Sequence, residues 1–245
     1  MNWFQYLTSA SSYGGGGGII HRLIQHLEYS GSALLVTVVI ALPLGLVLGH
    51  LRRGSGFVLG LANLGRAIPA FGIIVIFAVS AYGVNLATLT ITLVLFALPQ
   101  VLTNTYTGVA EVNLDVVQAA RGIGMGEAQI LRRTELPLAL PLIASGIRGA
   151  AVQIVGTATI AAYAGAGGLG AIVFQGYASN VRYLQIGGAV LVVLLALVVQ
   201  GGLGLMQRLV TPVPLRRYGL FFRDPNRRRR SAAAADVAAM PSALP

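Results

Sequence analysis

The segment Gly31–His50 reads GSALLVTVVIALPLGLVLGH and contains no Asp, Glu, Lys or Arg. A helix needs about 20 mainly apolar residues to cross the hydrocarbon core of a bilayer. This stretch is long enough, so it predicts a membrane-spanning helix. A secretory signal peptide is not expected, because residues 1–18 are polar and glycine-rich and the apolar run exceeds the usual length of a signal core.

Four further stretches, outward from this segment, have the length and composition of spans. They lie at about residues 57–81, 85–108, 138–162 and 183–207, and Arg66 and Pro69 interrupt the first of them. Only 10% of the chain is charged, whereas soluble domains carry about 25%. The expected fold is therefore an all-α integral membrane protein with five transmembrane helices.

Arginine is distributed unequally between the connections of these spans. Thirteen arginines fall on the side that holds residues 51–56, the loop 109–137 and the C-terminal tail, whereas Arg22 and Arg182 fall on the other side. Positive residues are enriched in cytoplasmic loops. We therefore expect a multi-pass protein of the plasma membrane, with the N-terminus outside and the C-terminus and the loop 109–137 in the cytoplasm.

The chain divides into three expected regions. Residues 1–25 form an extracytoplasmic segment, 26–208 the membrane domain, and 209–245 a basic tail that we expect to be disordered and to touch anionic lipid. Residues 19–30 predict a separate amphipathic helix at the outer interface. Its apolar face would consist of Ile20, Leu23, Ile24 and Leu27.

Composition excludes several classes of function. The chain has no Lys, so it cannot form the P-loop that binds ATP in many ATPases. It has no Cys and only three scattered His, so no metal site is expected, and no hydrolase triad is plausible. We expect no enzyme activity, no cofactor in this chain and no nucleic-acid partner, because the arginines that give the net charge of +10 are explained by topology.

Acidic residues are absent from the expected spans. Proton-coupled carriers commonly use buried carboxylates as relays, so a stand-alone carrier of that kind is disfavoured. Sodium coupling through backbone carbonyls stays open. If ATP drives this protein, another chain must bind it.

The most informative segment is Asp115–Arg148, DVVQAARGIGMGEAQILRRTELPLALPLIASGIR. Its first seven residues favour a helix, Gly122, Gly124 and Gly126 favour a turn, and the following residues favour a second helix. A helix–turn–helix on the cytoplasmic side is compatible either with a simple packed loop or with a docking element for a soluble partner.

This segment resembles the EAA loop of importer-type ABC permeases. The family pattern is Glu-Ala-Ala, three residues, Gly, nine residues and Ile-x-Leu-Pro. The matching positions are Gln118, Ala119, Ala120, Gly124, Glu135, Leu136 and Pro137, with Gln118 in place of the glutamate and Thr134 in place of the isoleucine. The loss of that glutamate removes a charge that could pair with a partner arginine, although a glutamine still hydrogen-bonds.

The resemblance covers about residues 26–208 and includes NTYTGV at 104–109 and AGAGGLG at 164–170, which are similar to the osmoprotectant branch. It implies an importer permease for glycine betaine, choline or carnitine. The implied partners are ATPase subunits that bind ATP and magnesium, a second permease of the same or similar sequence, and an extracytoplasmic substrate-binding protein. An amino-acid importer such as a methionine permease and a non-transporting membrane scaffold remain alternatives.

Several other residues are candidates for the pathway or its gate: Arg66, Pro69, Gly165, Gly167 and Gly168. Arg66 either lines the pathway or extends its charged end toward the membrane surface. Pro69 is expected to kink the second span. The glycine segment forms either a re-entrant turn that gates the pathway or a plain outer loop.

Overall fold

The computed structural model describes residues 2–15, 17–67 and 69–211, and within these ranges the chain forms helices and their connections without a β-strand. Met1–Val210 is one compact unit. The basic tail, for which the sequence predicts disorder, lies outside the described residues from position 212 onward.

Four helices are long and apolar enough to cross a membrane individually. They are α2 (Ile19–His50), α5 (Leu86–Ala110), α8 (Leu136–Ala161) and α10 (Arg182–Val210). The helices α3 (Ser55–Ala67) and α4 (Ala70–Val79) form a further apolar pair that is bent by 70°. The bend falls at Pro69, as the sequence predicts, because proline has no N–H to continue a helical ladder. The structure thus contains four spans, or five if the bent pair counts as one.

The helix α2 differs from its expected form. Residues 19–30 are not a separate interfacial helix, because α2 runs without a break through Ser30 and Gly31. Ile20, Ile24 and Leu27 are exposed along its outer side, so they lengthen the apolar face of the span. A helix of this length extends about 48 Å, which is more than the hydrocarbon thickness of about 30 Å. A tilted or protruding span accommodates both parts of the sequence.

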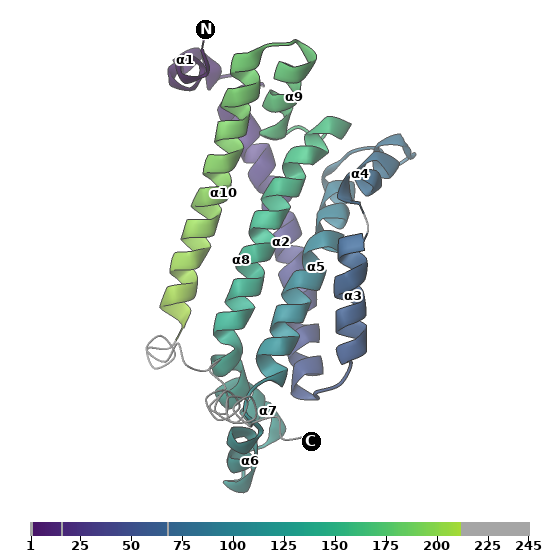
Figure 1. Ribbon diagram of the computed structural model, residues 1–245, viewed down its shortest axis with the longest axis vertical. Coiled ribbons are helices and arrows are strands. Elements are labelled where there is room, and N and C mark those ends of the chain that lie inside the picture. Colours follow the sequence, from purple (N-terminus) through teal and green to yellow (C-terminus); the bar gives the residue numbers. More distant parts are fainter. Residues whose placement is uncertain (1, 16, 68, 212–245) are drawn as a thin grey trace, which may run out of the picture. The chain divides into compact units, whose positions relative to one another are not determined.

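The centre of the molecule is α5, which packs against α2, α3 and α8 (Figure 1). Two glycines allow α2 to approach α5 closely. A Cβ atom on Gly45 would lie 2.6 Å from Cβ of Thr105, and one on Gly49 would lie 2.8 Å from Cβ of Val109. Small residues at such positions let helices pack tightly where lipid supplies little driving force for association.

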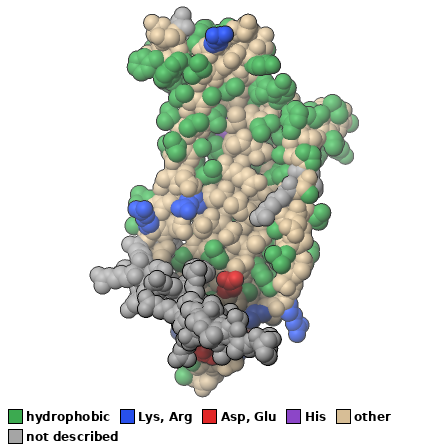
Figure 2. Space-filling view, in the orientation of Figure 1, with side chains coloured by type: hydrophobic (Ala, Val, Ile, Leu, Met, Phe, Trp, Pro, Cys, Tyr) green, Lys and Arg blue, Asp and Glu red, His purple; other side chains and the backbone are tan. Residues whose placement is uncertain are grey.

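The short helices gather at the two ends of these spans (Figure 1). One end carries α6 (Leu114–Gly122) and α7 (Glu127–Ile130), and the opposite end carries α1 (Trp3–Thr8), α9 (Gly170–Ala178) and α4. On the face drawn in Figure 2, apolar side chains lie along the length of the spans, and the visible acidic side chains lie toward the end with α6 and α7.

The helix α1 is not among the elements expected from the sequence. This helix begins with a capping box between Asn2 and Gln5, which satisfies backbone N–H groups at its start. Tyr6 packs on α10, where its ring centroid lies 5.9 Å from that of Tyr183. The N-terminal segment is therefore anchored on the last span.

Candidate functional site

The helix–turn–helix predicted from the sequence is present at one end of the spans. Asn113 caps α6 by accepting a hydrogen bond from the N–H of Asp115 at 2.8 Å. The helix ends at a Schellman motif, in which the N–H of Met125 bonds to the carbonyl of Ala120 and that of Gly124 to the carbonyl of Arg121. Gly124 has φ +84°, a conformation that favours glycine.

The second helix of the loop is not separated from the following span. After α7, residues Leu131–Glu135 form a single π-helical turn (η2), and α8 begins directly at Leu136. The N–H of Leu136 bonds to the carbonyl of Leu131, five residues earlier. Because Pro137 has no N–H, it cannot continue the regular ladder, and a π turn accommodates the gap. The loop is therefore attached to α8 as a continuous helical arm.

A small apolar cluster holds the two helices of the loop together. Val117 and Ala120 of α6 pack against Ile130 of α7, with Val112 and Met125 at the sides. Ile130 is fully buried. This cluster makes the loop a packed unit instead of a flexible connection.

Charged side chains join the loop to the end of α2. Nδ1 of His50 lies 2.6 Å from Oε2 of Glu135, and Nε2 lies 3.2 Å from Oε2 of Glu127. The side chain of Glu135 is 1% exposed. A neutral imidazole carries one N–H, so only the imidazolium donates to both carboxylates at once.

Glu127 also pairs with α6. The guanidinium of Arg121 donates from Nε to Oε1 at 2.8 Å and from Nη2 to Oε2 at 2.9 Å. This bidentate hydrogen bond raises the pKa of the Arg121 guanidinium. Glu127 is therefore the meeting point of α6, α7 and α2.

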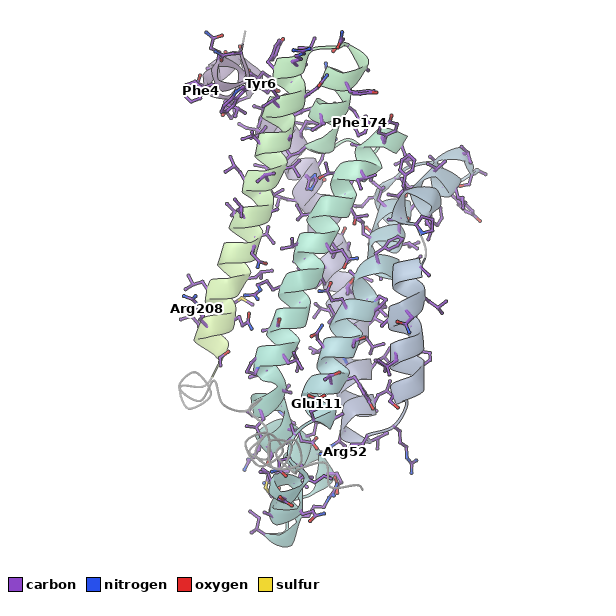
Figure 3. The ribbon with its side chains drawn as sticks, viewed as in Figure 1. Phe4, Tyr6, Arg52, Glu111, Phe174 and Arg208 are labelled. Atoms are coloured by element: carbon purple, nitrogen blue, oxygen red, sulfur yellow. The ribbon has the colours of Figure 1, made fainter. Side chains whose placement is uncertain are left out.

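Arg52, just after α2, makes a third contact with the loop. Its Nη2 donates to the carbonyl of Val112 at 2.6 Å. Figure 3 shows Arg52 and Glu111 at the same end of the molecule as α6 and α7. The end of α2 and the residues just after it thus contact the start, the middle and the end of the loop.

The structure brings the loop candidates from the sequence into one unit. Gln118 and Ala119 are exposed on α6, Ala120 is in its buried cluster, and Gly124 forms the turn. Glu135, Leu136 and Pro137 lie where the arm joins α8. Sequence reasoning misses His50, Arg52 and Glu127 as partners, because their contacts join positions 60 to 85 residues apart.

The gate candidates lie elsewhere, and none of their described side chains or glycines meets the loop. The segment with Gly165, Gly167 and Gly168 follows η3 (Ala162–Ala164), and all three glycines have positive φ. The N–H of Gly168 donates to Oε1 of Gln25 on α2 at 3.2 Å. This segment is therefore packed on the N-terminal half of α2.

Aromatic rings link the glycine segment to the bent pair. The ring centroid of Tyr163 lies 5.7 Å from that of Phe71 on α4 and 3.8 Å from that of Phe174 on α9. The start of α4, which Pro69 precedes, is thereby brought against η3. Arg66 belongs to α3, but its side chain lies outside the described part of the structure.

Residues 41–212 match the family model described as the binding-protein-dependent transport system inner membrane component. The chain belongs to this family. The match runs from within α2 to beyond the end of α10, so it includes the loop and the spans that carry it. The protein is accordingly a multi-pass permease component of the plasma membrane.

Relatives described as permeases are similar in sequence to this protein over most of its chain. The chain is 35% identical to the choline transport system permease protein OpuBB of Bacillus subtilis, over 82% of this chain and 93% of the relative. It is 34% identical to the osmoprotectant import permease protein OsmW of Salmonella typhimurium, over 88% of this chain and 100% of the relative. These relatives are transport permeases and not enzymes.

A solved structure has the same arrangement of helices as this permease. The MetNI methionine ABC transporter, in an inward-facing conformation, matches with a TM-score of 0.70 and 25% identity. The match covers 79% of this chain and 96% of that chain. The fold is therefore that of an ABC permease of this type.

Proposed function

We propose that this chain is the permease subunit of an ATP-driven, binding-protein-dependent importer for osmoprotectants such as glycine betaine, choline or carnitine. The observation that carries the proposal is the packed loop at one end of the spans, in a chain whose relatives are choline and osmoprotectant permeases. The domain that performs transport would be residues 26–208, with the basic tail 209–245 at the membrane surface.

The proposed topology has five spans, with the bent pair α3–α4 counted as one. The N-terminus is outside and the C-terminus is in the cytoplasm, because the arginines flanking the spans are concentrated on the side of the loop. In this orientation α6 and α7 face the cytoplasm, where an ATPase subunit reaches them. The glycine segment and the aromatic rings face the outside.

The loop has a surface that suits a protein partner. Leu114, the first residue of α6, is 50% exposed, and Ile123, just after that helix, is 80% exposed. Gln118 and Ala119 are exposed on α6 itself. Apolar side chains that gather on an exposed surface mark interaction sites, and Leu114, Val116 and Ile123 are all exposed within this short segment. We assign this surface to a cytoplasmic ATPase subunit, which would bind ATP and magnesium in place of this chain.

The mechanism follows from the continuous arm. ATP-driven closure of two ATPase subunits would move the loop, and η2 would pass that movement to α8 without a flexible joint. A second permease subunit, of the same or similar sequence, would complete the pathway. The most apolar stretch of α10 has no buried residue, which leaves that helix available for a partner subunit or lipid.

At the outer end, the glycine segment with Gly165, Gly167 and Gly168 would act as the gate. Its contacts with Gln25, and the rings of Phe71 and Tyr163, would hold it against α2 and α4 in the closed state. An extracytoplasmic substrate-binding protein would deliver the solute to this end. Arg66 and Pro69 would shape the pathway below the gate.

Uptake of radiolabelled glycine betaine and choline at high osmolarity tests the proposal. We expect cells that lack this chain, and lack other uptake systems for these solutes, to lose uptake and to regain it with the wild-type chain. Unchanged uptake of both solutes would exclude them as cargo. Copurification with an ATPase separates a transporter from a non-transporting scaffold.

A methionine importer is the second candidate, because the MetNI transporter has the same fold. Uptake of radiolabelled methionine in the same pair of strains separates the two candidates. Loss of methionine uptake with retention of betaine and choline uptake would favour this second function.

A further inference from the structure

We propose that His50 is a positioning residue that fastens the coupling loop to the end of α2, so that movement of the loop reaches α2 as well as α8. The inference rests on the proposed function, because it assumes that the loop receives movement from an ATPase. It concerns a residue outside the EAA-like segment and a contact between two parts of the chain that the loop pattern does not contain.

The position of His50 is unusual for a residue at a helix end. Its side chain is 13% exposed, and both ring nitrogens face carboxylates, one on α7 and one on η2. A histidine that simply ends a span would be free to face water or lipid headgroups. Here the ring lies between the loop and the base of α8.

The two carboxylates come from opposite ends of the segment that precedes α8. Glu127 is the first residue of α7, and Glu135 is the last residue of η2. Because the side chain of His50 contacts both carboxylates, it bridges the π turn from the side. A change in the angle between α7 and α8 would therefore move at least one carboxylate relative to His50.

The surroundings of His50 hold it in place. Gly49 lies so close to α5 that an added Cβ atom would meet Cβ of Val109 at 2.8 Å. Arg52 donates to the carbonyl of Val112 and fixes the chain that follows the helix. The end of α2 thus cannot slide along α5 to follow the loop unless the helix moves as a body.

The geometry of these contacts predicts two routes by which movement of the loop reaches the spans. The continuous arm transmits movement to α8, and His50 transmits the same movement to α2. Because α2 also carries Gln25, which accepts a hydrogen bond from Gly168, one continuous helix connects the loop to the glycine segment at the opposite end. His50 supplies the loop end of that connection.

The test uses the complete transporter, reconstituted in proteoliposomes with its ATPase, partner permease and binding protein. Solute uptake and ATP hydrolysis are measured on the same preparation. We expect His50→Ala to retain ATP hydrolysis within about twofold while the uptake per ATP falls at least about fivefold, the lower end of typical coupling effects. Arg53→Ala is the matched control, because Arg53 is exposed near the same helix end and makes no side-chain hydrogen bond or ion pair in the described structure.

Two further variants separate positioning from loss of folding. His50→Gln keeps a hydrogen-bond donor of similar size and should restore part of the uptake per ATP. If His50 acts through Glu135, the double variant His50→Ala with Glu135→Gln should be no worse than the poorer single variant, since residues in direct contact are not additive.

The outcomes distinguish this inference from the proposed function. Normal uptake per ATP in His50→Ala, together with loss of coupling in a variant of Gly124, would overturn the role of His50 and leave the coupling loop standing. Normal coupling in both would overturn the loop assignment as well. If His50→Ala fails to assemble, the test rests on His50→Gln. An uptake per ATP in His50→Gln as low as that of a Gly124 variant would contradict the proposal, because the hydrogen-bond donor that glutamine retains would then have no effect.

Discussion

Nδ1 of His50, at the end of the first long span, lies 2.6 Å from Oε2 of Glu135, at the base of α8. The two residues are 85 positions apart in the chain. The contact joins the end of α2 to the start of α8, and Glu135 is buried there. The loop is therefore attached to the spans by side-chain contacts as well as by the chain itself, which connects it to α5 at its start and, through η2, to α8 at its end.

The turn at Gly124 provides a direct test of loop rigidity. Gly124→Val should reduce uptake per ATP and leave membrane insertion intact, because a residue with a Cβ costs about 1–2 kcal/mol in a left-handed conformation. A Cβ atom there would meet nothing within 4 Å, so the effect comes from the backbone alone. Measured uptake and ATP hydrolysis in proteoliposomes check this.

Gly122→Ala is the control for that substitution. Gly122 ends α6, has open space around it and has no positive φ. Alanine favours the helix over glycine by about 1 kcal/mol, so the control should match or exceed the wild type in stability. Equal coupling in the two variants would contradict a special role for the left-handed turn.

The π turn before α8 leads to a second prediction. Pro137→Ala supplies an N–H that favours a regular α-helical ladder, which would rotate the loop relative to α8. We expect unchanged or higher thermal stability with reduced uptake per ATP. Pro141→Ala, within the regular part of α8, supplies an N–H without altering the π turn and should retain coupling. A Pro137→Ala variant with normal transport would show that the angle of the arm is unimportant.

The close approach of α2 and α5 predicts a strict size limit at Gly45. Gly45→Leu should lower the melting temperature of the purified protein, because overpacking costs about 1–3 kcal/mol. Gly31→Ala is the matched control on the same helix, since an added Cβ there meets nothing within 4 Å. Thermal unfolding followed by fluorescence or size exclusion compares the two variants. Equal melting temperatures would argue against the tight packing of α2 on α5.

The aromatic contacts at the opposite end predict an effect on leakage. Tyr163→Ala removes the ring that joins Phe71 of α4 to Phe174 of α9. If this group holds the outer gate closed, solute uptake without the binding protein should rise. Tyr177→Ala is the control, because Tyr177 is 70% exposed on the same helix as Phe174. No rise in the Tyr163 variant would separate these rings from gating.

The pair of Arg121 and Glu127 is expected to matter less than the contact between His50 and Glu135. Both side chains of the first pair are about half exposed, at 49% and 56%, and exposed ion pairs are weakened by water and salt. Arg121→Gln should therefore change thermal stability little and reduce uptake per ATP less than His50→Ala. The reverse order of the two variants would show that the ion pair within the loop matters more for coupling than the contact of the loop with α2.

Much of the fold is predictable from the sequence because spans depend on local composition. The end of the first span at His50, the interruption at Pro69 and the bounds near Asn85 and Arg182 all match the structure closely. A bilayer demands long apolar helices whatever their neighbours are. The position of Gly124 likewise indicates the turn, since glycine frees the backbone locally. The position of Pro137 indicates the start of a span, since proline restricts the backbone.

Other features depend on contacts between distant segments. The sequence predicts that the helix over residues 19–30 is separate from the span that begins at Gly31, but α2 continues through Gly31. Packing and apolar surroundings support a helix there, although the local residues disfavour one. The helix α1 acquires its place only by packing Tyr6 on α10. Neither the continuity of α2 nor the packing of α1 on α10 can be predicted from the residues of one short segment.

The sequence by itself determined the class of protein, the approximate spans and the loop pattern, since these follow from hydropathy, proline, glycine and spacing along the chain. Only the tertiary structure decided that His50 meets Glu127 and Glu135, and that α7 continues into α8. The physical reason is that a side-chain contact depends on where helix packing places two distant segments. Residues 50 and 135 are brought together by α2, α5 and α8 jointly, and no single stretch of sequence specifies that meeting.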